Sequence, residues 1–148
     1  MKKLKNWVAN KLGYFLGLDI GDVRTGIAKS DPLNIFAISL DTIPAPSLLT
    51  ELKKIINPDC EGLVVGLPLN LKGEKHHKAL QIETTIAKIQ TEFPSLKIIS
   101  IDERFTSKLA QQYIIASGIK KEKRREKGLV DAKAAAIILQ SYLDQKNH

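Results

Sequence analysis

Short apolar runs separated by turn residues open the chain, and a longer helical periodicity follows. Up to residue 40, the runs predict strands at 14–19, 26–30 and 35–40. The segment 31–34 (DPLN) supplies the turn between the second and third of them. Because connections this short join antiparallel neighbours, we expect the three strands to form a meander.

After residue 46, helical and extended patterns alternate. The predicted elements are a helix at 47–56, a strand at 62–67, a helix at 79–93, a strand at 97–101 and helices at 106–118 and 131–143. We expect Ser47 and Asp131 to begin their helices as capping residues. Right-handed crossovers of this kind add parallel strands to the meander. The order predicts an α/β fold: a mixed five-stranded sheet with helices on both faces, as in ribonuclease H-like domains.

Composition is that of an ordinary globular chain. Of the 148 residues, 43% are hydrophobic and 26% are charged, which suits a single domain at 13–148 preceded by a basic extension at 1–12. The single cysteine, Cys60, excludes an intrachain disulfide and suits a reducing cytoplasm. No apolar stretch approaches the ~18 residues of a membrane-spanning helix, so we expect no association with a membrane.

The net charge of +7 is concentrated in two segments. Residues 1–12 hold four lysines and no acid, and residues 120–127 hold six basic and two acidic residues, which leaves the other 128 residues at −1. Concentrated basicity favours a polyanionic partner such as nucleic acid, because phosphate contacts release counterions. Two solvated surface segments are the alternative interpretation of the same charges.

Four acidic residues occur where predicted elements begin or end. Asp19 ends the first strand and Asp131 begins the last helix, while Asp102 and Glu103 follow the last strand. Gathered at one edge of the sheet, they form a dense set of oxygen ligands suited to Mg²⁺ or Mn²⁺. Such ions activate water for attack on a phosphodiester. We therefore identify Asp19, Glu103 and Asp131 as candidate catalytic residues and metal ligands, with Asp102 as a fourth candidate ligand.

Each acid also has a purely structural interpretation. Asp19 fits a turn residue before Gly21, and Asp131 fits a helix cap. Asp102 and Glu103 fit ordinary surface charges. Their placement at corresponding element ends favours the metal site over these separate interpretations.

Basic side chains near these acids are candidate contacts for phosphates. Lys72 precedes Gly73, whose backbone freedom allows close approach to a ligand, and the basic segment 120–127 is expected to clamp a nucleic acid. The complete set of candidate nucleic-acid contacts is Arg24, Lys72, Arg104, Lys108, Lys120, Lys121, Arg124 and Arg125.

Four sequence blocks resemble the signature blocks of the YqgF/RuvX family. They are GLDIGDVRTGIAKSD (17–31), VVGLPLNLKG (64–73), DERFTS (102–107) and VDAKAAAIILQSYL (130–143). They extend over about residues 14–143 in matching order and spacing, and four separate blocks are far more specific than one. Members of the family are described as pre-16S rRNA nucleases, related in fold to the Holliday junction resolvase RuvC.

The resemblance implies roles for the acids. Asp19 matches the first-strand aspartate of the family, Asp131 matches the aspartate of the last helix, and Asp102 with Glu103 matches the acidic pair after the last strand. Related enzymes commonly carry an acid on the strand at 62–67, which has none here, so the second acid comes from one strand further. Alternation directs Asp102 and Glu103 to opposite faces, and we favour Glu103 because its longer side chain spans the extra ~4.8 Å.

The resemblance also implies a biological role and shows two departures. It implies a metal-dependent nuclease that matures the 5′ end of 16S rRNA, with pre-rRNA and the precursor of the small ribosomal subunit as partners. Val23 stands where members usually have lysine or a similar polar residue, which weakens the case for a phosphate contact there. Phe105-Thr106-Ser107 replaces Leu-Thr-Thr and keeps a hydroxyl.

Three other functions share parts of this pattern. A Holliday junction resolvase would cut DNA as a symmetric dimer, whereas no strong dimer face is visible and we expect a monomer or a weak homodimer. A non-catalytic RNA-binding factor in ribosome assembly would not need the acids. The motif from Asp19 to Gly21 is similar to the first phosphate loop of actin-like ATPases, but those enzymes need a second comparable domain, for which 148 residues leave no room.

Overall fold

The computed structural model describes residues 13–69, 72–73, 77–103 and 127–147, and from 127 to 131 it describes the helical backbone alone. The extension at 1–12 and the predicted helix at 106–118 lie outside the described residues. The elements are β1 (Tyr14–Ile20), β2 (Arg24–Ser30), β3 (Ala37–Pro44), a 3-10 turn η1 (Ala45–Ser47), α2 (Leu48–Ile55), β4 (Cys60–Leu67), α3 (His77–Glu92), β5 (Ile98–Asp102) and α5 (Lys127–Lys146).

The strands form one sheet in the order β3-β2-β1-β4-β5. Antiparallel pairing joins β1 to β2 and β2 to β3, and parallel pairing joins β1 to β4 and β4 to β5. The predicted meander with two crossover strands is thereby confirmed. Because β1, β4 and β5 run parallel, their carboxyl ends at Ile20, Leu67 and Asp102 meet at one edge, which we call the carboxyl edge.

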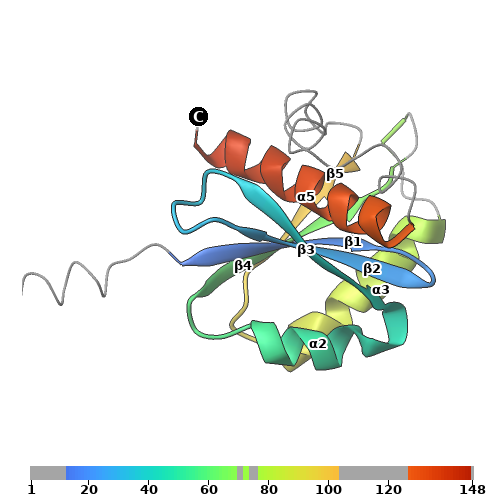
Figure 1. Ribbon diagram of the computed structural model, residues 1–148. Coiled ribbons are helices and arrows are strands. Elements are labelled where there is room, and N and C mark those ends of the chain that lie inside the picture. Colours follow the sequence, from blue (N-terminus) through green and yellow to red (C-terminus); the bar gives the residue numbers. More distant parts are fainter. Residues whose placement is uncertain (1–12, 70–71, 74–76, 104–126, 148) are drawn as a thin grey trace, which may run out of the picture.

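Side chains alternate between two apolar layers, one on each face of the sheet. On one face, Leu16 and Leu18 of β1 pack with helices α2 and α3, and on the other, Phe15 of β1 and Val64 of β4 pack with α5. Figure 1 shows α5 across one face and α2 and α3 on the other, as predicted. These four side chains are at most 3% exposed, and burying each stabilises the fold by about 1.5–3 kcal/mol.

Helix α5 approaches the sheet closely at Gly17. A Cβ at that position would lie 2.7 Å from the Cβ of Leu139 and 2.8 Å from the carbonyl oxygen of Ala135. Ala132, Ala135 and Ala136 are buried on the same helix, which bears out the interpretation of a small-residue face that permits close approach. The glycine on β1 and the alanines on α5 together set the distance between helix and sheet.

The side chain of Gln140 fixes α5 against the edge strand. Its Oε1 accepts a hydrogen bond from the backbone N–H of Ala37, and its Nε2 donates to the carbonyl oxygen of Ile35, both at 2.8 Å. Nearer the start of the helix, Ser39 Oγ donates to the carbonyl oxygen of Ala132 at 3.1 Å. These bonds hold the helix at a fixed position along its own axis, and hence fix where along β1 its first turns lie.

Strand β3 (Ala37–Pro44) is displaced from the predicted strand at 35–40. The carboxylate of Asp31 accepts hydrogen bonds from the backbone N–H groups of Ile35 and Phe36, at 2.7 and 2.8 Å. Bonds of this kind compete with strand pairing, so the turn extends through Phe36 and the strand begins after it.

The predicted caps of two helices are wrong. Ser47 precedes α2 but makes no capping hydrogen bond with its side chain, because the 3-10 turn at Ala45–Ser47 leads directly into the helix. Helix α5 begins at Lys127, so Asp131 lies one turn inside it and is not its cap. Residues 127–130 contain no proline that would stop the helix from extending backwards.

Candidate metal centre

Asp19 lies at the carboxyl edge, one residue before the end of β1. It is half-buried and pairs with Gly26 of β2. Since side chains alternate along a strand, Asp19 lies on the same face as Gly17, which α5 covers. The following turn is closed by the N–H of Gly21, which donates to the carbonyl oxygen of Arg24 at 2.9 Å, so β2 begins two residues earlier than predicted.

Glu103 follows β5 directly and lies on the same face of the sheet as Asp19. Ile99 and Ile101, at the alternate positions before it, pack in the α5 layer. The half-buried side chain of Glu103 extends over the neighbouring strand β4 at Gly66, where an added Cβ would lie 2.6 Å from Glu103 Oε1. Because position 66 has no side chain, the carboxylate reaches across β4 towards β1.

Asp102 lies on the opposite face. It is the last residue of β5 and is in register with Leu67, which packs in the layer of α2 and α3. The structure therefore separates Asp102 from Glu103 as strand alternation predicts. Of the two acids, Glu103 shares the face of Asp19.

The pKa of Glu103 is raised above its ordinary value. Burial of the carboxyl group is the largest cause, and the negative charge of Asp19 is the next. Lys78 opposes the rise, and Asp102 adds a smaller contribution to it. Two half-buried carboxylates on one face, with the charge of Asp19 acting on Glu103, form a candidate cation site, because their oxygens are the donors that Mg²⁺ and Mn²⁺ prefer.

Asp131, the third predicted ligand, is described by its backbone alone. It lies in α5 one turn before Ala135, whose carbonyl oxygen lies over Gly17 on β1. Among the side chains that the structure describes, no group of three or more histidine, cysteine, aspartate or glutamate residues is gathered. The described part of the site is therefore the pair formed by Asp19 and Glu103.

Gly66→Ala is expected to impair the site more than the fold. The new methyl group would lie 2.6 Å from Glu103 Oε1 and 2.6 Å from Ile138 Cδ1, both ends of flexible side chains that can move aside. Displacing a catalytic group by about 1 Å costs on the order of a hundredfold in rate, whereas overpacking of this size costs about 1–3 kcal/mol. Metal-dependent cleavage rates and thermal melting measure the two effects.

Gly62→Ala is the matched control for this prediction. It lies on the same strand and the same face, and its Cβ would meet the Phe15 ring at 3.1 Å, far from Glu103 along the strand. We expect Gly62→Ala to retain wild-type cleavage. A Gly66→Ala protein that cleaves as fast as the control would contradict the role of the missing side chain.

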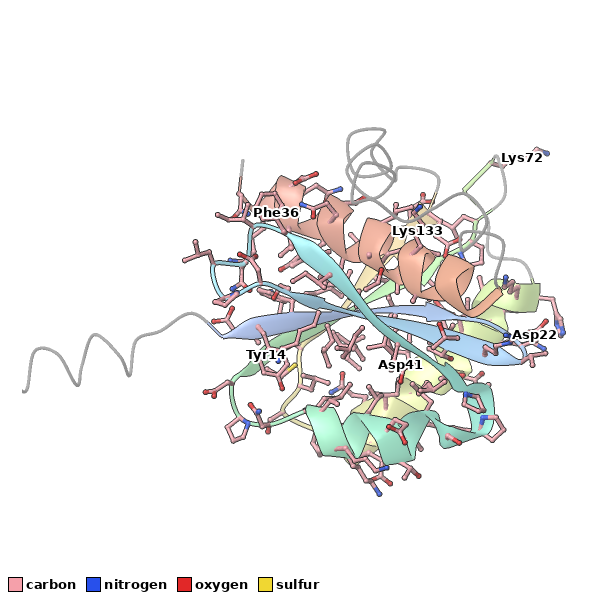
Figure 2. The ribbon with its side chains drawn as sticks, in the orientation of Figure 1. Tyr14, Asp22, Phe36, Asp41, Lys72 and Lys133 are labelled. Atoms are coloured by element: carbon pink, nitrogen blue, oxygen red, sulfur yellow. The ribbon has the colours of Figure 1, made fainter. Side chains whose placement is uncertain are left out.

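Two of the predicted nucleic-acid contacts lie in the described part of the chain. Arg24 begins β2 two residues before Gly26 and therefore lies on the face of Asp19. Lys72 is exposed and points away from the body of the molecule (Figure 2). The other six lie outside the described residues: Arg104, Lys108, Lys120, Lys121, Arg124 and Arg125.

Lys78 is a candidate site residue that sequence reasoning missed. It lies in the first turn of α3, and its charge acts on Glu103 although the body of this helix packs on the other face. It lines the same cavity as Gly21 and Asp22, so the start of α3 lies at the carboxyl edge. No spacing in the sequence distinguishes Lys78 from the other surface lysines.

A family model described as RuvX, Holliday junction resolvase, matches residues 13–145. The chain belongs to the RuvX family. Its relatives include a protein of Porphyromonas gingivalis that is 43% identical over 134 residues, 90% of this chain and 97% of the relative. A protein of Flavobacterium johnsoniae is 39% identical over 132 residues, 88% and 96% of the two chains. Both relatives are named "Putative pre-16S rRNA nuclease".

A solved structure supports the fold of this RuvX chain. RuvC of T. thermophilus, in complex with a Holliday junction substrate, superposes with a TM-score of 0.57 at 15% identity, covering 90% of this chain and 96% of the other. At this identity the likeness concerns the fold alone, and it confirms the predicted ribonuclease H-like arrangement. The family and relatives are described as a resolvase and nucleases, which agrees with the predicted hydrolase acting on phosphodiester bonds.

Proposed function

We propose that this chain is a metal-dependent endonuclease that cleaves the RNA precursor of 16S rRNA. The observation that supports this chemistry is that half-buried Asp19 and Glu103 lie on the face that α5 covers, with Gly66 between their strands and the charge of Asp19 acting on Glu103. The two relatives match this chain over about nine-tenths of its length, and their names favour pre-16S rRNA as the substrate.

Asp19, Glu103 and Asp131 would hold the ion, Mg²⁺ or Mn²⁺. When bound, such an ion makes a water molecule nucleophilic and neutralises charge on the phosphate. Asp19 on β1 and Glu103 after β5 would hold it from two positions that the sheet fixes relative to each other. Asp131 would approach from α5, whose distance from β1 is set at Gly17.

The surrounding basic residues would bind and orient the RNA. Arg24 lies on the face of Asp19, and we propose that it contacts a phosphate near the scissile bond. Lys78 reduces the negative charge that an approaching phosphate meets, because its charge acts on Glu103. The segments 1–12 and 120–127 are basic in sequence and would add further phosphate contacts.

Partners and compartment follow from this function. We propose the precursor of the small ribosomal subunit as the partner that presents the RNA, and the cytoplasm as the compartment. A monomer or a weak homodimer stays our prediction for the oligomeric state. Within the described residues, no helix combines the length and apolar character needed to cross a membrane.

A cleavage assay with three substrates tests the proposal. Purified protein is incubated with Mn²⁺ or Mg²⁺ and an RNA that spans the 5′ end of 16S rRNA and its precursor sequence, with a four-way DNA junction, and with single-stranded DNA. We expect cleavage of the RNA that EDTA abolishes. Cleavage of the junction alone would instead identify a resolvase. Tight binding of the RNA without cleavage, in the presence of either metal, would identify a non-catalytic assembly factor.

A further inference from the structure

A cavity of about 410 Å³ opens at the carboxyl edge on the face opposite to Asp19. It lies between the β1–β2 turn, the start of α2 and the first turns of α3. Asp22, which lines it, lies at this end of the sheet, and Tyr14 lies at the other end (Figure 2). Its volume is in the range of sites that bind small molecules.

Thr25 brings an unpaired polar group to this cavity. Its side chain is fully buried, and it pairs across the strands with Ile20 and Ile43, so it lies on the face of α2 and α3. Its hydroxyl oxygen forms no hydrogen bond with any group in the part of the chain that the structure describes. An unpaired buried hydroxyl is unfavourable, whereas valine has the same shape without that cost. Thr25 lines the cavity, so this unsatisfied hydroxyl belongs to the cavity wall.

The other walls combine apolar sides with a second hydroxyl. Ile20, Leu48 and Ile82 line the cavity with aliphatic surface suited to a flat ring. Thr85 Oγ1 donates to the carbonyl oxygen of Gln81 at 3.3 Å, which leaves its lone pairs able to accept a hydrogen bond. Apolar sides together with the hydroxyls of Thr25 on β2 and Thr85 on α3 match the plane and the polar edge of a nucleobase.

The rim connects the cavity to the acid pair. Ile20 and Gly21, which line it, directly follow Asp19 in the chain. Lys78 also lines it, and the charge of Lys78 acts on Glu103 around the edge of the sheet. An ammonium group in this position suits a phosphate, and the exposed carboxylate of Asp22 can accept hydrogen bonds from ribose hydroxyls.

We propose that the cavity binds one unpaired ribonucleotide of the strand that is cleaved, with the base against Thr25 and Thr85 and a phosphate at Lys78. The proposal rests on the proposed function, since it takes Asp19 and Glu103 as the cleavage centre. A free ribonucleoside monophosphate presents the same base, ribose and phosphate. The strand is the source that we infer because the cavity adjoins Asp19.

Binding of abasic RNA tests this assignment without cleavage. Fluorescence anisotropy in EDTA compares a fully abasic six-nucleotide RNA with strands that retain a single base, in four versions for the four bases. We expect one retained base to tighten binding to the wild-type protein about tenfold, the scale of one base contact. A strand with a single base has no other base to fix its position and can shift along the protein. The result therefore does not depend on which position carries the base.

Thr25→Val and Thr84→Val are the matched variants. Thr84 lies on α3, is exposed, and bonds to the carbonyl oxygen of Leu80 without lining the cavity. We expect the tenfold gain to persist in Thr84→Val and to fall below about threefold in Thr25→Val. The melting temperature of Thr25→Val is expected to equal or exceed that of the wild-type protein, because the variant removes an unpaired hydroxyl.

Four results would overturn the assignment. They are no gain from any retained base, an equal gain in both variants, a lowered melting temperature of Thr25→Val, and no binding of any RNA. A monophosphate that competes as well as the one-base strand would place a free nucleotide in the cavity instead. Because EDTA removes cleavage from the assay, a base effect without nuclease activity elsewhere would refute the proposed function alone.

Discussion

Asp19→Asn is expected to lower the metal-dependent cleavage rate by about a thousandfold with little change in folding. The amide keeps the size of the side chain but loses the charge that holds the ion, and several kcal/mol of transition-state stabilisation correspond to a factor of this order. Initial rates of RNA cleavage in Mn²⁺ measure the loss. Far-ultraviolet circular dichroism and thermal melting verify the fold.

A second measurement ties the loss to the acid pair. Because the charge of Asp19 raises the pKa of Glu103, Asp19→Asn is expected to lower that pKa, which a metal-free NMR titration of the Glu103 carboxyl detects. Asp59→Asn is the control: Asp59 is exposed and lies beside Tyr14, at the other end of β1. If Asp19→Asn cleaves at the rate of Asp59→Asn, the metal-site assignment fails.

Glu103→Gln is expected to abolish cleavage to a similar extent and yet to raise the melting temperature of the metal-free protein at pH 7. The folded-state pKa of Glu103 is raised, chiefly by burial and then by Asp19, so its neutral form is favoured by folding. That stability is present below the unfolded-state pKa and is lost as the pH rises through the folded-state pKa. Glutamine never ionises and therefore keeps it.

Low pH should remove this difference in melting temperature, and the metal should oppose it. As the pH falls below the ordinary pKa of glutamate, the melting temperatures of the wild-type protein and Glu103→Gln should converge. Added Mn²⁺ should raise the melting temperature of the wild-type protein more than that of the variant, because only the intact set binds it tightly. A variant that melts lower than the wild-type protein in EDTA at pH 7 would refute the electrostatic account.

Asp102→Asn separates the two neighbouring acids. Asp102 lies on the opposite face, so its neutralisation should reduce cleavage by less than about tenfold, through its field on Glu103 alone. A loss as large as that of Glu103→Gln would return Asp102 to the set of ligands.

Periodicity was sufficient to predict the sheet and the faces of its acids. The apolar run at 62–67 contains no acid, and alternation then assigns Asp102 and Glu103 to different faces, as the structure has them. Both inferences need only the two-residue period of a strand. The function was inferred from the resemblance of four sequence blocks to a family, because the spacing of apolar residues carries no information about function.

Features that depend on the particular contacts of single side chains could not be predicted. The turn through Phe36 comes from hydrogen bonds of the Asp31 carboxylate that compete with strand pairing. The contribution of Lys78 and the unpaired hydroxyl of Thr25 depend on how the first turns of α3 meet the β1–β2 turn. Neither contact leaves a pattern along the chain.

The position of the Glu103 carboxylate depends on two residues of the sequence, Glu103 itself and Gly66. The side chain of Glu103 extends towards Asp19 only because Gly66, between their strands, has no side chain. The effect of the glutamate therefore depends on the glycine, and the effect of the glycine depends on the glutamate. Substitutions at the two positions should therefore be strongly non-additive. A side chain on β4 at position 66 would enter the space of the Glu103 carboxylate, so a lineage that moved the acid onto β4 would have to change both positions.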